Sequence, residues 1–198
     1  KIEHHAILHT AAYLEERGFE VTYLDVDEFG KVNPADVEAA IRPDTILISV
    51  MYANNEIGTI EPIKEIGEIA HKDGILFHTD AVQAFGQVPI NVDECHIDML
   101  SASGHKLNGP KGIGFLYIKE GTKISPIIFG GGQQKGMRSG TENVPAYAGL
   151  GVAAEEIYTD FDKKIAHMYS IRDHFIDEVL QIDGVTVNGR CDHENAPH

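Results

Sequence analysis

The chain has 198 residues, of which 42% are hydrophobic and 24% charged, a composition typical of a globular protein rather than a disordered one. Lysine and arginine number 16 against 31 aspartates and glutamates, so the net charge is −15. A surface this acidic repels phosphate backbones and anionic lipid heads, and we expect neither nucleic-acid nor membrane binding as the main function. No stretch approaches the ~20 apolar residues of a membrane span and no signal peptide is visible, so we expect a cytoplasmic protein.

Helix-like and strand-like segments alternate along the chain. Apolar residues recur at helical spacing over residues 6–17, and residues 19–24 are rich in the β-branched and aromatic residues of a strand. Asn33 and Pro34 predict the start of a second helix that runs to about Ile41, because asparagine caps helices and proline suits the first helical position.

The middle of the chain continues this alternation. Residues 45–51 form an almost wholly apolar run, typical of a strand that is buried on both faces of a parallel sheet. A helix over residues 62–72 follows, and three more strands are expected over residues 75–78, 98–101 and 114–118. The alternation predicts an α/β fold with a mainly parallel sheet flanked by helices.

The pattern changes in the last quarter of the chain. Residues 146–180 predict one long helical stretch, interrupted near residues 158–161, and a fresh strand is expected over residues 184–187. We therefore expect a large ligand-binding domain over residues 1–150, incomplete at its N-terminus. The remainder, residues 151–198, is expected to be a connecting helix and the start of a smaller domain, because it is too short to close a core of its own.

Polar side chains follow three of the predicted strands where each strand ends. In chain order they are Asn54 and Asn55, then Asp80 and Gln83, then Ser103, His105 and Lys106. Each of them taken singly has a simpler interpretation as a turn former, a helix cap or a solvated loop residue. Ligands in open α/β sheets bind beyond the carboxyl ends of the strands, so their coincidence at successive strand ends favours a ligand site.

The residue types in this set indicate which ligand they suit. A lysine such as Lys106 forms a Schiff base with an aldehyde cofactor, and an aspartate such as Asp80 holds a pyridine nitrogen protonated. Ser103 and His105, with nearby backbone N–H groups, suit a phosphate, and Gln83 can donate to a ring oxygen. These demands together describe pyridoxal 5'-phosphate (PLP).

The stretch SASGHKLNGPKGIG, residues 101–114, resembles the PLP-lysine motif of class V aminotransferases, and within that group most resembles the cysteine desulfurases of the NifS and IscS type. Supporting stretches occupy residues 2–8, 52–60, 77–86 and 130–144. The resemblance runs from Ile2 to about Leu180. It implies the large domain of a fold type I, aspartate aminotransferase-like, PLP-dependent transferase.

The resemblance also assigns catalytic and ring-binding roles to single positions. Lys106 resembles the Schiff-base lysine, and His4 the histidine that stacks on the cofactor ring and is placed for proton transfer. Asp80 matches the partner of the pyridinium nitrogen, and Gln83 the donor to the ring hydroxyl. His5 falls at a variable position of the family, and we assign it no role.

The remaining matched positions concern the phosphate and the substrate carboxylate. Ser103 and His105 match phosphate ligands, and Asn55 matches a residue beside the cofactor and the substrate carboxylate. Thr141 resembles the residue that reaches the phosphate of the other subunit in a homodimer.

By this resemblance the full enzyme converts L-cysteine to L-alanine and leaves sulfane sulfur on an enzyme cysteine. The sulfur would then pass to a sulfur acceptor or an iron–sulfur scaffold protein. Two readings in the same class remain open, a selenocysteine lyase and a class V aminotransferase. A third alternative is a folded fragment that does not catalyse.

The departures from the family pattern concern length and cysteines. Family members are about twice as long, and their glycine-rich phosphate loop, sulfur-accepting cysteine and carboxylate-binding arginine have no counterpart here. Cys95 and Cys191 lie where the family has no catalytic residue, so we expect both to be structural. The chain alone is therefore expected to be inactive as a desulfurase.

Overall fold

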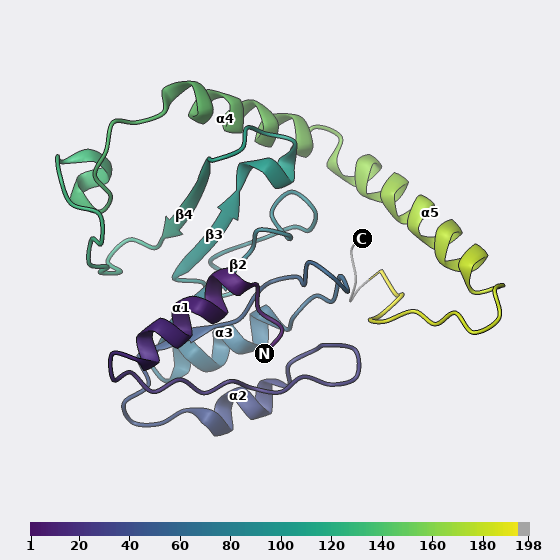
Figure 1. Cartoon of the computed structure of the whole chain (residues 1–198), viewed down its shortest axis with the longest axis horizontal. Helices are drawn as coiled ribbons and strands as arrows, with labels where there is room; N and C mark the ends of the chain where they lie inside the picture. The colour runs from purple at the N-terminus through teal and green to yellow at the C-terminus, as the bar shows by residue number, and fades with distance from the viewer. Residues whose placement is uncertain (194–198) are drawn as a thin grey trace.

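Four strands form one sheet in the computed structural model, which describes residues 1–193 (Figure 1). Their order is β1-β2-β3-β4, with β1, β2 and β3 parallel and β4 antiparallel to β3. The bounds are β1 Leu47–Ser49, β2 Leu76–Asp80, β3 Met99–Ser103 and β4 Gly114–Ile118. The α/β prediction with a mainly parallel sheet is confirmed.

Helices flank this sheet on both sides. Figure 1 places α2 and α3 on one side and α4 on the other, and α5 extends away from the strands. The bounds are α1 His5–Glu15, α2 Pro34–Ala40, α3 Ile63–Lys72, α4 Val144–Tyr158 and α5 Phe161–Val179, with short 3-10 helices η1 Gly104–Leu107 and η2 Gln133–Gly136.

The helix ends follow the local sequence. The Asn33 side chain accepts a hydrogen bond from the Ala35 N–H, which caps α2 as expected. The long C-terminal stretch is interrupted where the sequence predicted, because Asp160 has a left-handed backbone with φ of +54° that ends the run of helical hydrogen bonds between α4 and α5.

The hydrophobic core lies between the sheet and the helices α2 and α3. Ile63, Ile66 and Ala70 of α3 are buried at helical spacing, which gives this helix one apolar face against β2. On the strands, Phe77 and Leu100 point to the same layer and are buried. The other members of the core cluster include Val37, Ile48, Ala81, Ala84, Ile97 and Ala102.

The predictions of two strands are wrong. Residues 19–24 and 184–187 have no strand structure, because a strand needs a neighbouring chain to pair with, and no such partner lies beside them in the described residues. The run over residues 45–51 is also less buried than expected. Ile46 is 66% exposed and Leu47 46%, since β1 lies at the edge of the sheet.

None of the helices within residues 1–193 combines the length and the apolar character that crossing a membrane requires.

Candidate active site

The two faces of the parallel strands differ in chemistry. Side chains alternate between the faces of a strand, so Phe77 and Thr79 point into the core layer, whereas His78 and Asp80 point to the opposite face. Ser101 is the register partner of Asp80 in the neighbouring strand and shares this face. The sheet therefore presents a polar face at the carboxyl ends of its strands.

Asp80 is the last residue of β2 and is held firmly at this edge. It is 8% exposed, and its Oδ1 accepts a hydrogen bond from the Val82 N–H at 3.0 Å. Its backbone carbonyl accepts from the Tyr52 N–H at 2.8 Å, which ties the end of β2 to the segment that follows β1. A carboxylate in this setting can hold a proton on a nitrogen of a bound ring.

Lys106 and Gln83 line one hollow of about 160 Å³, together with Val82, Gln87 and Met168. Lys106 lies on η1 directly after β3, and Gln83 lies in the turn after β2, so both come from adjacent strand ends as expected. Met168 shows that α5 reaches over this hollow. Pockets for small ligands usually exceed about 300 Å³, so only part of such a ligand would lie inside it.

The turn that carries Lys106 requires glycine and a left-handed residue. A Cβ at Gly104 would lie 2.9 Å from Ile113 Cγ2 and 3.2 Å from Leu150 Cδ1 of α4, so even an alanine there would force these side chains to shift. Asn108, with φ of +59°, ends η1 and turns the chain towards β4. This close approach fixes the lysine-bearing turn between the sheet and α4.

The two predicted phosphate ligands contact each other. Ser103 Oγ lies 2.7 Å from His105 Nδ1, and the His105 ring is exposed to solvent. A hydroxyl and an imidazole at this distance can donate hydrogen bonds to the same anion. Both groups belong to the segment between β3 and Lys106.

The segment with His4 is fastened to the end of β1 by its neighbours. The Glu3 Oε1 accepts from the Met51 N–H at 2.6 Å, and Asn54 Nδ2 donates to the Ile2 carbonyl at 2.9 Å. His4 itself caps α1, with Nδ1 accepting from the Ala6 N–H at 3.1 Å. The neutral His4 ring therefore carries its proton on Nε2.

Asn55 and Thr141 are placed differently from the other predicted residues. Asn54 is buried and accepts from the Glu56 and Ile57 N–H groups, and this turn leaves Asn55 exposed next to it. Thr141 is exposed in the segment before α4 and is not among the residues that line the hollow with Lys106. The structure therefore does not bring Thr141 to the Lys106 hollow.

Two buried carboxyl groups near this edge were missed by the sequence reasoning. Burial raises the pKa of Glu3 to about 7, with the Met51 N–H lowering it and Asp80 raising it further. Burial likewise raises the pKa of Glu61 to about 7, although the Val32 N–H that donates to it acts in the opposite direction. Each carboxyl has one buried oxygen without a hydrogen-bond partner in the described part of the chain.

His78 is a further polar residue of this face that was not predicted, because it lies inside β2 rather than at its end. It lies inside the stretch FHTDAVQ, two residues before Asp80, so strand alternation alone places it on the polar face. Its two ring nitrogens lie 2.8 Å from Ser49 Oγ and 2.9 Å from Ser101 Oγ. Burial lowers the pKa of His78, and Asp80 raises it by a smaller amount.

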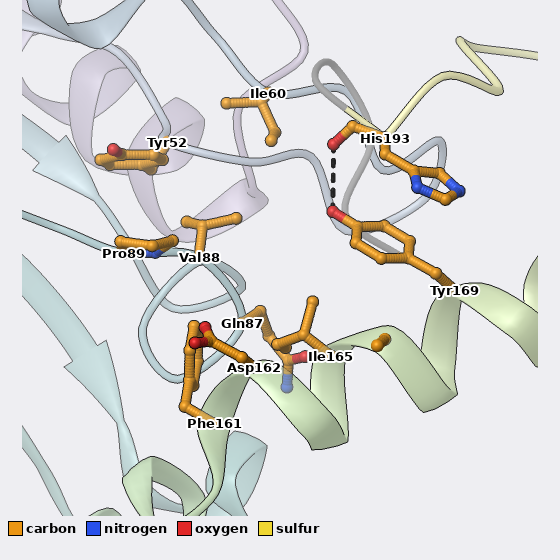
Figure 2. Close-up of a pocket in the computed structure, with 11 residues that line it drawn as sticks. Tyr52, Ile60, Gln87, Val88, Pro89, Phe161, Asp162, Ile165, Tyr169 and His193 are labelled. Carbon is orange, nitrogen blue, oxygen red and sulfur yellow. Dashed lines mark hydrogen bonds between the residues drawn. The ribbon is translucent and has the colours of Figure 1, made fainter.

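A larger pocket of about 400 Å³ lies between α5 and the loops after β1 and β2 (Figure 2). Figure 2 shows Tyr52 and Val88 on one side and Phe161 and Ile165 of α5 on the other. The Tyr169 hydroxyl donates to the His193 carbonyl at 3.0 Å at its rim. The pocket is mainly apolar and includes no predicted site residue, so the smaller hollow with Lys106 is the better candidate for chemistry.

Neither cysteine lies in the hollow with Lys106. Cys95 is buried, and burial raises the pKa of its thiol, with Glu94 as the next cause. Cys191 is exposed, and its carbonyl accepts a hydrogen bond from Arg172. Residues 1–193 contain no group of three or more histidine, cysteine, aspartate or glutamate side chains arranged to hold a metal ion.

Comparison with known proteins identifies the family. The class V aminotransferase pattern matches residues 1–198, the whole chain. The chain belongs to the class V aminotransferase family. This membership confirms the resemblance stated from the Lys106 motif.

Named relatives of this class V chain are cysteine desulfurases. It is 56% identical over 188 residues to cysteine desulfurase IscS of Methanosarcina thermophila, which covers 95% of this chain and 46% of that protein. It is 47% identical over 195 residues to the mitochondrial cysteine desulfurase of Saccharomyces cerevisiae, covering 98% of this chain and 39% of the yeast protein. The chain thus spans about half the length of these relatives or less.

Solved structures of the same class share the fold. A NifS-like protein superposes with a TM-score of 0.93 at 39% identity, covering 99% of this chain and 54% of the other. SspA in complex with cysteine gives a TM-score of 0.77 at 50% identity, covering 78% of this chain and 45% of the other. The expected fold type I architecture of PLP-dependent transferases is confirmed.

PLP is the cofactor of this class, and the donor set present in the chain fits it. The hollow supplies an amine from Lys106 and an amide from Gln83, and Asp80 supplies an anion at the adjacent strand end. Ser103 and His105 supply two neighbouring donors for a phosphate. When bound, PLP would provide an electron sink next to the amine of a substrate.

Proposed function

We propose that this chain is the cofactor-binding part of a PLP-dependent cysteine desulfurase, which converts L-cysteine to L-alanine and passes the sulfur to a cysteine elsewhere in the complete enzyme. The observation that carries the proposal is the hollow shared by Lys106 and Gln83 at the carboxyl ends of β2 and β3, next to the buried Asp80. The identity of 56% to a cysteine desulfurase supports it.

Four side chains of this chain would act on the cofactor ring and the reacting carbon. Lys106 would hold the aldehyde end of the cofactor through Nζ, and the same amine could move a proton at the substrate carbon. The Asp80 carboxylate would hold a proton on the ring nitrogen, and Gln83 would donate to the ring oxygen. His4 would stack on the ring and present Nε2 to it, because Nδ1 accepts a hydrogen bond from the Ala6 N–H.

Three other side chains complete the proposed binding site. Ser103 and His105, which already contact each other, hold the phosphate. Asn55, presented by the buried Asn54 turn, lies beside the carboxylate of the substrate. Thr141 completes the phosphate site of a second subunit rather than its own.

The proposal includes a homodimer. Thr141 is exposed and does not line the hollow with Lys106, which suits a residue that acts in a partner copy. The same segment before α4 exposes Ile127 by 88% and Phe129 by 80%, and exposed apolar side chains of this kind favour association.

We further propose residues 1–150 as the large domain and 151–198 as the connecting helix and start of a small domain.

The proposed setting is iron–sulfur cluster assembly in the cytoplasm, with a sulfur acceptor or an iron–sulfur scaffold protein as partner. The support is the IscS name carried by relatives such as that of Methanosarcina thermophila. The acidic surface of the chain fits small-molecule and protein partners better than nucleic acid.

A hybrid enzyme tests the proposed function. In the Methanosarcina thermophila relative, the segment that aligns with this chain is replaced by this chain, and PLP, L-cysteine and an excess of a dithiol reductant, which releases the persulfide sulfur as sulfide, are added. We expect sulfide and alanine in equal amounts, and their loss in the Lys106→Ala variant. The keto acid that corresponds to cysteine, formed in place of alanine, would indicate an aminotransferase. Turnover that survives Lys106→Ala would contradict the proposal.

A further inference from the structure

Three polar side chains form a row across the parallel strands β1, β2 and β3. Ser49 Oγ lies 2.8 Å from His78 Nδ1, and Ser101 Oγ lies 2.9 Å from His78 Nε2. Ser49 is also the register partner of His78 in the sheet. Both ring nitrogens have partners, so the row fixes the orientation of the His78 ring across three strands.

Ser101 connects this row to Asp80. Its side chain contacts His78, two residues before Asp80, and its carbonyl accepts from the N–H of Ala81, directly after Asp80, at 2.9 Å. The two contacts lie on either side of Asp80 along β2. Ser101 therefore holds the strand end from which the Asp80 carboxylate projects.

The row of Ser49, His78 and Ser101 adds no positive charge next to Asp80. Burial lowers the pKa of His78 and outweighs the opposite effect of Asp80, so the fold favours the neutral form of the ring. A neutral ring does not form an ion pair with Asp80, so the carboxylate stays available to a cationic group of a ligand. Both serines are uncharged and add no competing cation.

We propose that His78 is a positioning residue for Asp80, acting through its hydrogen bond to Ser101, so that the carboxylate is held where the ring nitrogen of a bound cofactor would lie. The contact between His78 and Ser101 stands on the structure of this chain alone. Only the purpose of the positioning rests on the proposed function.

Two substitutions of His78 separate the two hydrogen bonds. An asparagine amide reaches about as far as Nδ1 and can keep the contact with Ser49, whereas a glutamine amide reaches about as far as Nε2 and can keep the contact with Ser101. His78→Gln is therefore expected to preserve the position of Asp80, and His78→Asn to lose it. Thr79→Val is the matched control, because Thr79 is the next residue of β2, is fully buried and faces the opposite layer.

The reporter is the Val82 N–H, which donates to Asp80 Oδ1 at 3.0 Å. Hydrogen exchange of this amide, followed by NMR on the 198-residue chain without any cofactor, measures whether the carboxylate stays in place. We expect exchange about tenfold faster in His78→Asn, the factor that loss of about one hydrogen bond gives. His78→Gln and Thr79→Val are expected to match the unsubstituted chain.

A general loss of stability has a different signature, because it also speeds exchange of core amides such as that of Phe77. If His78→Asn unfolds the chain, Ser101→Ala removes only the hydroxyl and is expected to speed Val82 exchange alone. Equal exchange of Val82 in the asparagine and glutamine variants, or no change in Ser101→Ala, overturns the proposal.

The hybrid enzyme then tests the purpose of the positioning. His78→Gln is expected to keep the visible absorption of bound PLP and its pH profile, and His78→Asn to shift both towards those of Asp80→Asn. Failure of the unsubstituted hybrid to bind PLP would overturn the proposed function, whereas the Val82 result would still decide whether His78 positions Asp80.

Discussion

The buried carboxyl of Glu61 predicts a pH-dependent stability that can be measured without any ligand. Glu61 is 3% exposed, and its Oε2 accepts from the Val32 N–H at 2.8 Å, while Oε1 is buried without a partner among the described residues. Burial raises its pKa from 4.5 to about 7, with Glu3 and Asp27 as smaller causes in the same direction. The folded chain thus favours the protonated form.

The direction of the effect follows from proton binding. Between pH 4.5 and about 7, the folded state keeps the Glu61 proton and the unfolded state has lost it. The free energy of unfolding is therefore highest below this window and falls as the pH rises through it. At about 1.4 kcal/mol for each pH unit, the contribution of Glu61 amounts to about 3 kcal/mol.

The Glu61→Gln variant removes the titration and keeps an oxygen that can accept from the Val32 N–H. Urea unfolding of both proteins from pH 4.5 to 8 gives the difference in their free energies of unfolding, in which the other titrating groups largely cancel. We expect the unsubstituted chain to lose about 3 kcal/mol relative to the variant over this range. Glu68→Gln, at an exposed position of α3, is the matched control and should give a constant difference. A constant difference for Glu61→Gln as well would refute the reasoning, since Glu61 would then titrate alike in both states.

The other predictions concern single residues. In the hybrid enzyme, Asp80→Asn should reduce kcat by about 10²- to 10³-fold, equivalent to about 3 to 4 kcal/mol, and PLP retention far less; near-normal turnover would exclude the role. Cys95→Ser should leave sulfide production intact, because the thiol is buried with a raised pKa, and complete loss would show it to be the nucleophile. Gly67→Ala should cost about 1 to 3 kcal/mol or more in urea unfolding, since its Cβ would lie 1.9 Å from the Cys95 carbonyl oxygen. Gly151→Ala, with nothing within 4 Å, should be neutral or stabilise by up to about 1 kcal/mol, and equal effects at both glycines would contradict this packing of α3.

Local signals in the sequence were sufficient for most helices. The Asn33–Pro34 pair identified the start of α2, and apolar spacing identified the buried face of α3, because caps and amphipathic faces are properties of a short stretch. For residues 19–24 and 184–187, which were predicted as strands, local signals were not sufficient. Their composition suits a strand, but pairing depends on a neighbour that the local sequence does not specify.

The part of the candidate site that lies directly after the parallel strands could be predicted from the sequence. The turn after β2 and the turn after β3 bring Gln83 and Lys106 into one hollow, which followed from the parallel order of the strands. Glu3 and His78 were missed because their importance arises from tertiary contacts, with the Met51 N–H and with Ser49 and Ser101. Strand alternation from Asp80 could have identified His78, whereas no sequence signal pairs Glu3 with Met51.

The most direct test of the central claim is to find the lysine that bonds the cofactor. The hybrid enzyme is loaded with PLP and reduced with borohydride, which fixes the cofactor to that lysine, and the digested peptides are analysed by mass spectrometry. We predict the added mass on Lys106, on the turn after β3. Modification of Lys111 or another lysine, with Lys106 unmodified, would contradict the account of this site.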